Sequence, residues 1–304
     1  MSMSSSKLHE HAAVPGPAAM IVVLCAAGAA GGAGFSLSGA GVTLCACVAL
    51  LVFGLPHGTL DLEIIRARWR SPLTQLMPLL AVYLGLAAAM FGLWQVDPVV
   101  ALGSFIAIAV VHFSEDWEGA GSVILSGGLA LALLAAPTLL HRAELDTIFI
   151  DLTNRDTAVA ISQMLNGVAP ASLSLGAMAL IVLWRNGRRD QAVGGVAALA
   201  GMLLFPPIVG FAAYFCLFHS PRHFAHSLQD LHWRGVGSWG RVVIPLTLIA
   251  GLLAGVIYWI ELRSGLSGRV MTASFMTLSI LTVPHMLVPI IVSRLGGQEQ
   301  AEAV

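Results

Sequence analysis

Two histidines four residues apart, His219 and His223, lie within a long apolar stretch at about residues 206–228. On an α-helix this spacing places both imidazoles on one face, one turn apart, where they can reach a single metal ion. Pro221 between them removes a backbone hydrogen bond and bends the helix, and Arg222 adds a charge that hydrocarbon tolerates poorly. The segment predicts a metal site. The alternative is a pair of hydrogen-bonded packing histidines, or a segment at the membrane surface.

The composition indicates what kind of elements must position these residues. Of 304 residues, 57% are hydrophobic and 10% are charged, with a mean hydropathy of +0.86, whereas roughly 25% of residues are charged in an ordinary soluble domain. The apolar runs are long rather than short and alternating, which predicts an all-α integral membrane protein. A net charge of −1 without a basic block argues against nucleic acid as a partner.

Apolar runs separated by glycine, proline and charged clusters predict a bundle of about eight to ten transmembrane helices. A histidine-ligated metal site is expected inside this bundle. Residues 1–16 are expected to form a disordered cytoplasmic tail, 17–295 a single transmembrane domain, and 296–304 a disordered C-terminal tail. The polar interruption at 141–167 predicts a short interfacial helix. The expected helices are 16–34, 39–65, 73–94, 98–115, 121–140, 168–184, 191–205, 206–230, 241–262 and 270–293.

The break between the seventh and eighth of these segments, Phe205-Pro206-Pro207, is so short that the two can also be one bent element. Arginines follow the second, sixth and tenth segments and flank the loop after the eighth. Because cytoplasmic loops carry an excess of Lys and Arg, even-numbered segments are predicted to end in the cytoplasm. This predicts a multi-pass protein of the inner membrane with both termini cytoplasmic, although Arg263 and Arg269 run against the rule.

All the histidines within the predicted membrane segments lie on even-numbered segments, which run in one direction. At a rise of about 1.5 Å per residue, most of them fall at a similar depth in the cytoplasmic half of the bilayer. Packing histidines would have no reason to share direction and depth, so we expect these side chains to meet. They are His57, His112, His219, His223 and His285, and His226 is left as a neighbour on the eighth segment.

An aspartate follows two of these histidines by four residues: Asp61 follows His57, and Asp116 follows His112. A metal-bound imidazole needs its second ring nitrogen held, and a carboxylate is a common holder, so both aspartates are candidates for that role. The alternative is that they mark helix ends at the headgroups. Neutral imidazoles with few carboxylates suit iron, zinc or copper, and a mononuclear iron with open positions is favoured.

The ordered set of motifs resembles the Brp/Blh family of bacterial and archaeal membrane carotene dioxygenases. The resemblance rests on Pro56-His57-Gly58 with Asp61, on His112-Phe113 with Asp116, on Phe218-His219-Ser220-Pro221-Arg222-His223, and on Pro284-His285-Met286. It covers about residues 50–290. The resemblance implies Fe(2+) bound by His57, His112, His219 and His223. It leaves open whether His285 is a ligand, orients oxygen or lines the substrate channel.

The resemblance also implies the reaction, which is oxygen-dependent central cleavage of β-carotene, or a related carotenoid, to retinal. The implied partners are the carotenoid, O2, the lipid bilayer and, as a candidate retinal acceptor, a rhodopsin. Aromatic residues near the motifs are candidate walls of the substrate cavity, and Arg222 is a candidate partner of Asp61 or Asp116. The candidate walls are Phe113, Tyr214, Phe215 and Phe218.

Two other classes of protein stay open from the residues alone. A membrane non-haem iron desaturase or hydroxylase of a lipid carries about eight histidines in several clustered boxes, and this chain has one such box. A transporter that relays protons through histidines, or a membrane haem protein, needs no such boxes. A metal assay separates the transporter from the others, and optical spectroscopy separates haem from non-haem iron.

Overall fold

The protein is built from helices, and the part of the chain that the structure describes contains no strand. The computed structural model describes residues 16–58, 60, 63–64, 73–231, 236–264 and 268–302. The helices up to the middle of the chain are α1 (Ala18–Gly32), α2 (Ala40–Gly58), α4 (Leu73–Val96), α5 (Pro98–Ser114), η1 (Glu115–Ala120), α6 (Val123–Ala135), α7 (Pro137–Leu140) and α8 (Arg142–Leu152). They are followed by α9 (Arg155–Arg185), α10 (Arg189–Leu204), α11 (Pro207–Tyr214), η2 (Phe215–His219), α12 (Ser220–Asp230), α13 (Val236–Ser264) and α14 (Arg269–Glu302).

Six stretches within the described residues are long and apolar enough to cross a membrane. They are Met77–Val96, Pro98–Ala120, Val123–Leu140, Arg155–Arg185, Trp239–Ile260 and Val270–Val288. Ala18–Gly32 and Ala40–Gly54 are shorter apolar helices. The predicted fold class, an all-α multi-pass membrane protein, is confirmed.

The polar interruption differs from its prediction in one respect. A short helix, α8, does form there, but the next helix starts at Arg155 rather than at the expected residue 168. Asn154 caps it, because the Asn154 side chain accepts a hydrogen bond from the backbone N–H of Thr157 at 3.0 Å. The polar residues of 155–167 therefore belong to the first turns of a 31-residue helix, since a strong N-cap fixes where a helix begins.

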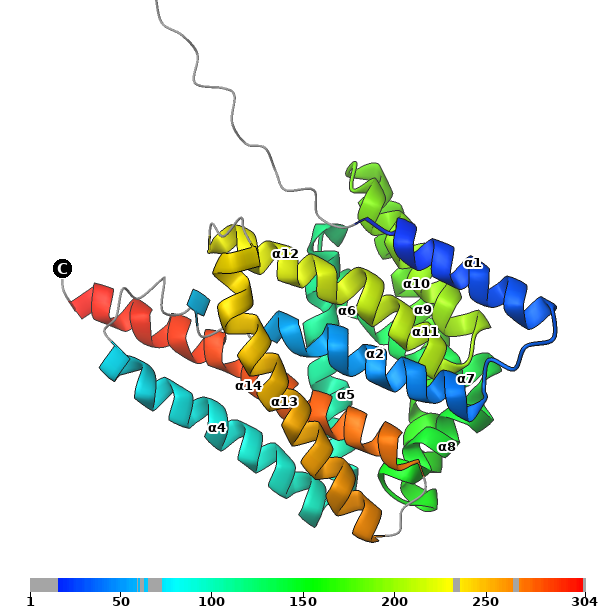
Figure 1. Ribbon diagram of the computed structural model, residues 1–304. Coiled ribbons are helices and arrows are strands. Elements are labelled where there is room, and N and C mark those ends of the chain that lie inside the picture. Colours follow the sequence, from blue (N-terminus) through cyan, green and yellow to red (C-terminus); the bar gives the residue numbers. More distant parts are fainter. Residues whose placement is uncertain are drawn as a thin grey trace, which may run out of the picture.

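Helix α14 packs against α2, α4 and α13, and its C-terminal part runs out to the edge of the molecule (Figure 1). Helix α4 runs along the outer side of α14, and α13 crosses it. Helices α6 and α9 form a second close pair, and α5 joins this pair to α4 and α14. The segment α11–η2–α12 lies beside α2, so α2, α5, α12 and α14 border a common interior.

Candidate metal centre

Helix α5 delivers the first histidine of the centre. Its N-terminus is fixed by Asp97, whose carboxylate accepts hydrogen bonds from the backbone N–H groups of Val99 and Val100, both at 3.1 Å, and by Pro98 at the first helical position. The α-helix ends at Ser114, and the tighter 3₁₀ turn η1 follows it. His112 therefore stands in the last turn of α5, where its side chain is 2% exposed.

The segment that carries His219 and His223 contains a π-helical turn, η2. In this turn the backbone N–H of Ser220 donates to the carbonyl of Phe215, five residues back. Pro221 follows directly and offers no N–H to the preceding turn, so the α-helical ladder is broken at this point. The predicted bend at Pro221 is thus realised as a π turn, which places Tyr214 and His219, five residues apart, on one face.

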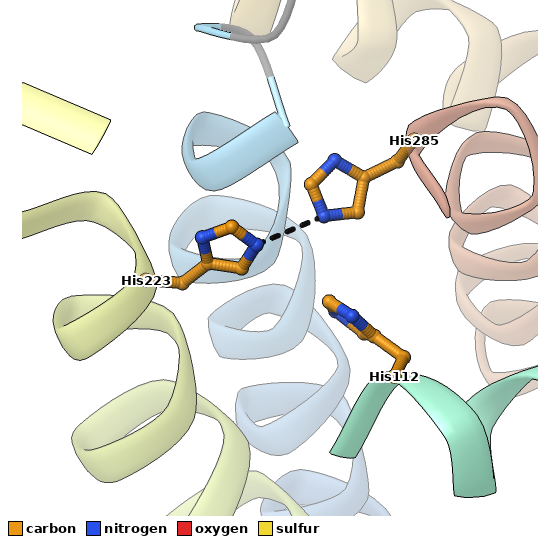
Figure 2. Close-up of side chains that lie close together, drawn as sticks. All are labelled: His112, His223 and His285. Atoms are coloured by element: carbon orange, nitrogen blue, oxygen red, sulfur yellow. Dashed lines mark hydrogen bonds between the residues drawn. The ribbon is translucent and has the colours of Figure 1, made fainter. Parts of the chain in front are cut away.

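Four imidazoles meet between α5, η2, α12 and α14. The Nε2 atoms of His219 and His112 lie 3.1 Å apart, and those of His223 and His285 also lie 3.1 Å apart. A ligand atom from each of His112, His223 and His285 lies within 4.8 Å of the others. Figure 2 shows these three side chains pointing toward one another from α5, α12 and α14.

The three imidazoles of His112, His223 and His285 can hold one transition-metal ion, and His219 adjoins this set through His112. Two imidazole nitrogens bound to one metal at ~2.1 Å lie about 3.0–3.4 Å from each other when they occupy adjacent positions. Both measured Nε2 pairs, at 3.1 Å, fall in that range. The donors are nitrogen atoms from imidazoles, a set that suits iron, zinc or copper rather than magnesium or calcium. A histidine cluster inside the bundle, as predicted from the sequence, is confirmed.

A carboxylate and a phenol hold one of the imidazoles from behind. His219 Nδ1 lies 2.9 Å from Asp116 Oδ2, and the hydroxyl of Tyr214 donates to the same oxygen at 2.6 Å. Because an ionised carboxylate only accepts, the His219 Nδ1 carries the proton, and its Nε2 lone pair faces the cluster. Asp116 and Tyr214 therefore fix both the tautomer and the ring orientation of His219.

From the sequence, Asp116 was predicted to contact His112, because residues four apart lie on the same face of an α-helix. The structure places Asp116 against His219 and Tyr214. The physical reason is the change from α to 3₁₀ geometry at Glu115, which ends the four-residue register. The acidic side chain recorded beside His112 Nδ1 is that of Glu115, whose Oε2 lies 3.5 Å away.

Helix α2 passes close to the cluster. The backbone of α2 is helical through Gly58, and the Ser220 hydroxyl donates to the carbonyl of Phe53, one turn before position 57. The His57 side chain and the whole of Asp61 lie outside the described residues. The predicted roles of His57 and Asp61 stay predictions.

Aromatic side chains surround the cluster and are almost fully buried. The Phe113 ring centroid lies 5.0 Å from that of His219, and the Phe215 ring stacks on His219 at 5.2 Å. The Phe218 ring stacks on that of Trp117, with ring centroids 5.4 Å apart. The guanidinium carbon of Arg222 lies 4.9 Å from the Phe218 ring centroid, a cation–π arrangement.

Three contributors to this site were not recognised as such in the sequence. Tyr214, expected as a cavity wall, is a hydrogen-bond donor to Asp116. Glu115 beside His112 and Trp117 behind Phe218 were passed over. No sequence signal distinguishes these side chains, because the 3₁₀ and π turns on which their directions depend have no simple residue pattern.

The fold and the cluster define a polytopic membrane protein with a buried histidine centre for a transition metal. A family model described as "Beta-carotene 15,15'-dioxygenase" matches residues 48–291. The chain therefore belongs to the β-carotene 15,15'-dioxygenase family, in agreement with the resemblance found in the sequence.

Two curated proteins are similar over most of the chain. The "Beta-carotene 15,15'-dioxygenase" of an uncultured marine bacterium, 66A03, is 28% identical over 261 residues, which cover 80% of this chain and 91% of that protein. The "Probable beta-carotene 15,15'-dioxygenase Blh" of Halobacterium salinarum is 26% identical over 295 residues, which cover 81% of this chain and 83% of that protein. No solved structure matches the chain.

Proposed function

We propose that this protein cleaves β-carotene, or a closely related carotenoid, at its central double bond to give retinal, with O2 as cosubstrate. The observation that carries the proposal is the buried cluster of four imidazoles in a chain of this family. The overall reaction balances without a further reductant. The central carbon–carbon double bond breaks, each of its two carbons receives one oxygen atom of O2, and two C20 aldehydes result.

We further propose that the resident metal is Fe(2+). His112, His219, His223 and His57 are the proposed ligands, and the position of His285 in the cluster makes it an additional candidate. Bound iron would supply the binding and activation of dioxygen, which imidazoles alone do not provide. Neutral imidazole ligands leave the charge of the metal uncompensated, which would favour the Fe(2+) state that binds dioxygen.

The residues of the chain would orient the reactants and keep water out. Asp116 and Tyr214 hold the His219 ring, so one edge of the centre is rigid before the substrate arrives. Phe113 and Phe215, which contact the histidines, would present apolar surface to a polyene. Tyr214 is fully buried and engaged with Asp116, so it acts in this proposal as a positioning residue rather than as a cavity wall.

The experiment that tests the function is expression in bacteria that make β-carotene, followed by chromatography of the extracted pigments. Cells grown in air should lose their colour and accumulate retinal, or retinol if host reductases act on the aldehyde. Cells grown without air should keep their β-carotene. Hydroxylated C40 products with an intact chain would instead support a membrane hydroxylase, and unchanged pigment with folded, metal-loaded protein would refute cleavage.

A further inference from the structure

An apolar cavity is lined in part by Phe113, the residue that follows His112. It has a volume of about 80 Å³ and is lined by apolar side chains of α5, α8, α11 and other helices. The contribution of α5 is one face of that helix, including Phe105, Ala109 and Phe113 at spacings of four residues. Its far part lies under α8, at Leu145, Phe149 and other residues of that helix. The cavity therefore extends along α5 from the neighbourhood of the cluster toward α8.

The Phe113 side chain contacts both the cavity and the histidine cluster. Phe113 lines the cavity and directly follows His112, and its ring centroid lies 5.0 Å from that of His219. Phe211, which also lines the cavity, packs on Phe113 with ring centroids 6.1 Å apart. Phe113 therefore lies at the junction between the cavity and the cluster.

The chemical character of the lining and the volume of the cavity together limit which molecules it can hold. A buried water needs about two to four polar partners, and no side chain that lines the cavity is polar. An apolar cavity that holds a benzene ring measures about 150 Å³, so the present 80 Å³ is too small for a carotenoid arm, which carries a six-membered ring and a long polyene. A diatomic apolar gas fits both limits.

We propose that this cavity is the route by which dioxygen reaches the centre, with Phe113 as the gate between them. The inference rests on the proposed dioxygenase function, because that reaction consumes O2 as its second substrate. It assigns separate access to the two substrates. The gas approaches along α5, while the carotenoid, which is too large for this cavity, must reach the imidazoles from another side.

The first measurement probes the cavity of the purified wild-type protein with xenon, an apolar atom that apolar cavities bind. Xenon-129 NMR should show a saturable bound population. Ala109→Leu, which fills the cavity from the α5 face, should abolish this population. The matched control is Ala107→Leu, since Ala107 is exposed on the same helix two residues away and does not line the cavity. The control should bind xenon as the wild type does.

The second measurement determines the KM for O2 and the KM for β-carotene by steady-state kinetics. In Ala109→Leu the KM for O2 should rise several-fold, while the KM for β-carotene and kcat at saturating oxygen stay at the wild-type values, as all three should in Ala107→Leu. Absence of bound xenon in folded wild-type protein would overturn the proposal. So would an unchanged KM for O2 in folded Ala109→Leu, including the case in which the KM for β-carotene rises instead. Wild-type protein that forms no retinal would refute the proposed function rather than the cavity assignment alone.

Discussion

At the scale of single residues, the centre combines side chains that can bind a metal with side chains that orient those ligands. The imidazoles present nitrogen donors to a common point, and two Nε2 pairs at 3.1 Å set the spacing. Asp116 and Tyr214 do not face that point but hold the far side of the His219 ring. Substitutions in the two groups should therefore differ in their effects on metal content.

The first prediction concerns the donors. His219→Ala and His223→Ala should each lose bound iron together with activity, because removal of one donor leaves an incomplete site. Metal content per chain by mass spectrometry and retinal formation are the measurements. His226→Ala is the matched control, since His226 is exposed on α12 less than one turn from His223. Full iron content and turnover in His219→Ala would refute the ligand assignment.

The second prediction concerns the group behind His219. Asp116→Asn should still bind iron, but with a loss of about 10- to 100-fold in affinity or activity, as is usual when a carboxylate partner of a ligating histidine is removed. Tyr214→Phe should show a smaller loss of the same kind, because Asp116 keeps its contact with His219. Iron titration against a chelator measures both. A loss in Tyr214→Phe as large as in Asp116→Asn would contradict this order.

At the scale of elements, the π turn η2 decides where the histidines point, and the helices around it leave it little freedom. Gly194 of α10 faces the Phe218 ring so closely that a side chain there would collide with it. Gly54 of α2 faces Phe215 from the other side, where an added Cβ would lie 2.6 Å from the ring carbon Cε1. These glycines allow α10 and α2 to approach the turn on both sides.

The third prediction tests the close packing of α2 against the π turn η2. Gly54→Ala should lower the unfolding temperature, with a cost of about 1–3 kcal/mol for overpacking, and should reduce iron content, because Phe215 and the turn that carries His219 must shift. Gly41→Ala, on the same helix with no atom near its added Cβ, is the control and should do neither. Thermal unfolding in detergent and metal analysis are the measurements. If Gly54→Ala kept the wild-type unfolding temperature and iron content, the close packing of α2 against η2 would not be required, and the prediction would be wrong.

At the scale of the whole molecule, the helices differ in how far their side chains are buried. The stretch Val270–Val288 of α14 is mostly buried, whereas α4 and α13 expose many apolar side chains such as Leu84 and Leu252 to the surroundings. Helices α4 and α13 therefore present apolar surface to the surroundings, while α14 contributes His285, which is 6% exposed, to the centre. The centre lies in a protein interior rather than at the lipid boundary.

The fourth prediction concerns orientation. From the arginine distribution we propose an inner-membrane protein with both termini in the cytoplasm. Fusion of a fluorescent protein that folds only in the cytoplasm to either terminus should give fluorescent cells. Fusion of alkaline phosphatase, which is active only outside the cytoplasm, should give inactive enzyme at both ends. The opposite pattern at either terminus would refute the assignment.

The sequence by itself determined the fold class and the family, and it predicted the four histidines that meet in the structure, His112, His219, His223 and His285. The length of an apolar segment predicts a membrane helix regardless of how the helix packs. Histidines are costly within the hydrocarbon of a membrane, so several of them at a similar depth indicate a shared functional site. Helix boundaries were predicted less well. Asn154 caps α9 within a polar stretch, so this helix begins at Arg155, earlier than the expected residue 168.

Only the tertiary structure decided how the side chains within the cluster are paired. Asp116 contacts His219 rather than following the four-residue pattern from His112, and Tyr214 joins it, because a 3₁₀ turn and a π turn change the direction of the side chains. The cavity beside Phe113 likewise exists only where helices from distant parts of the chain fail to fill the space between them. Helical periodicity assumes a regular helix, so it cannot predict directions where the helix is irregular, nor the gaps that packing leaves.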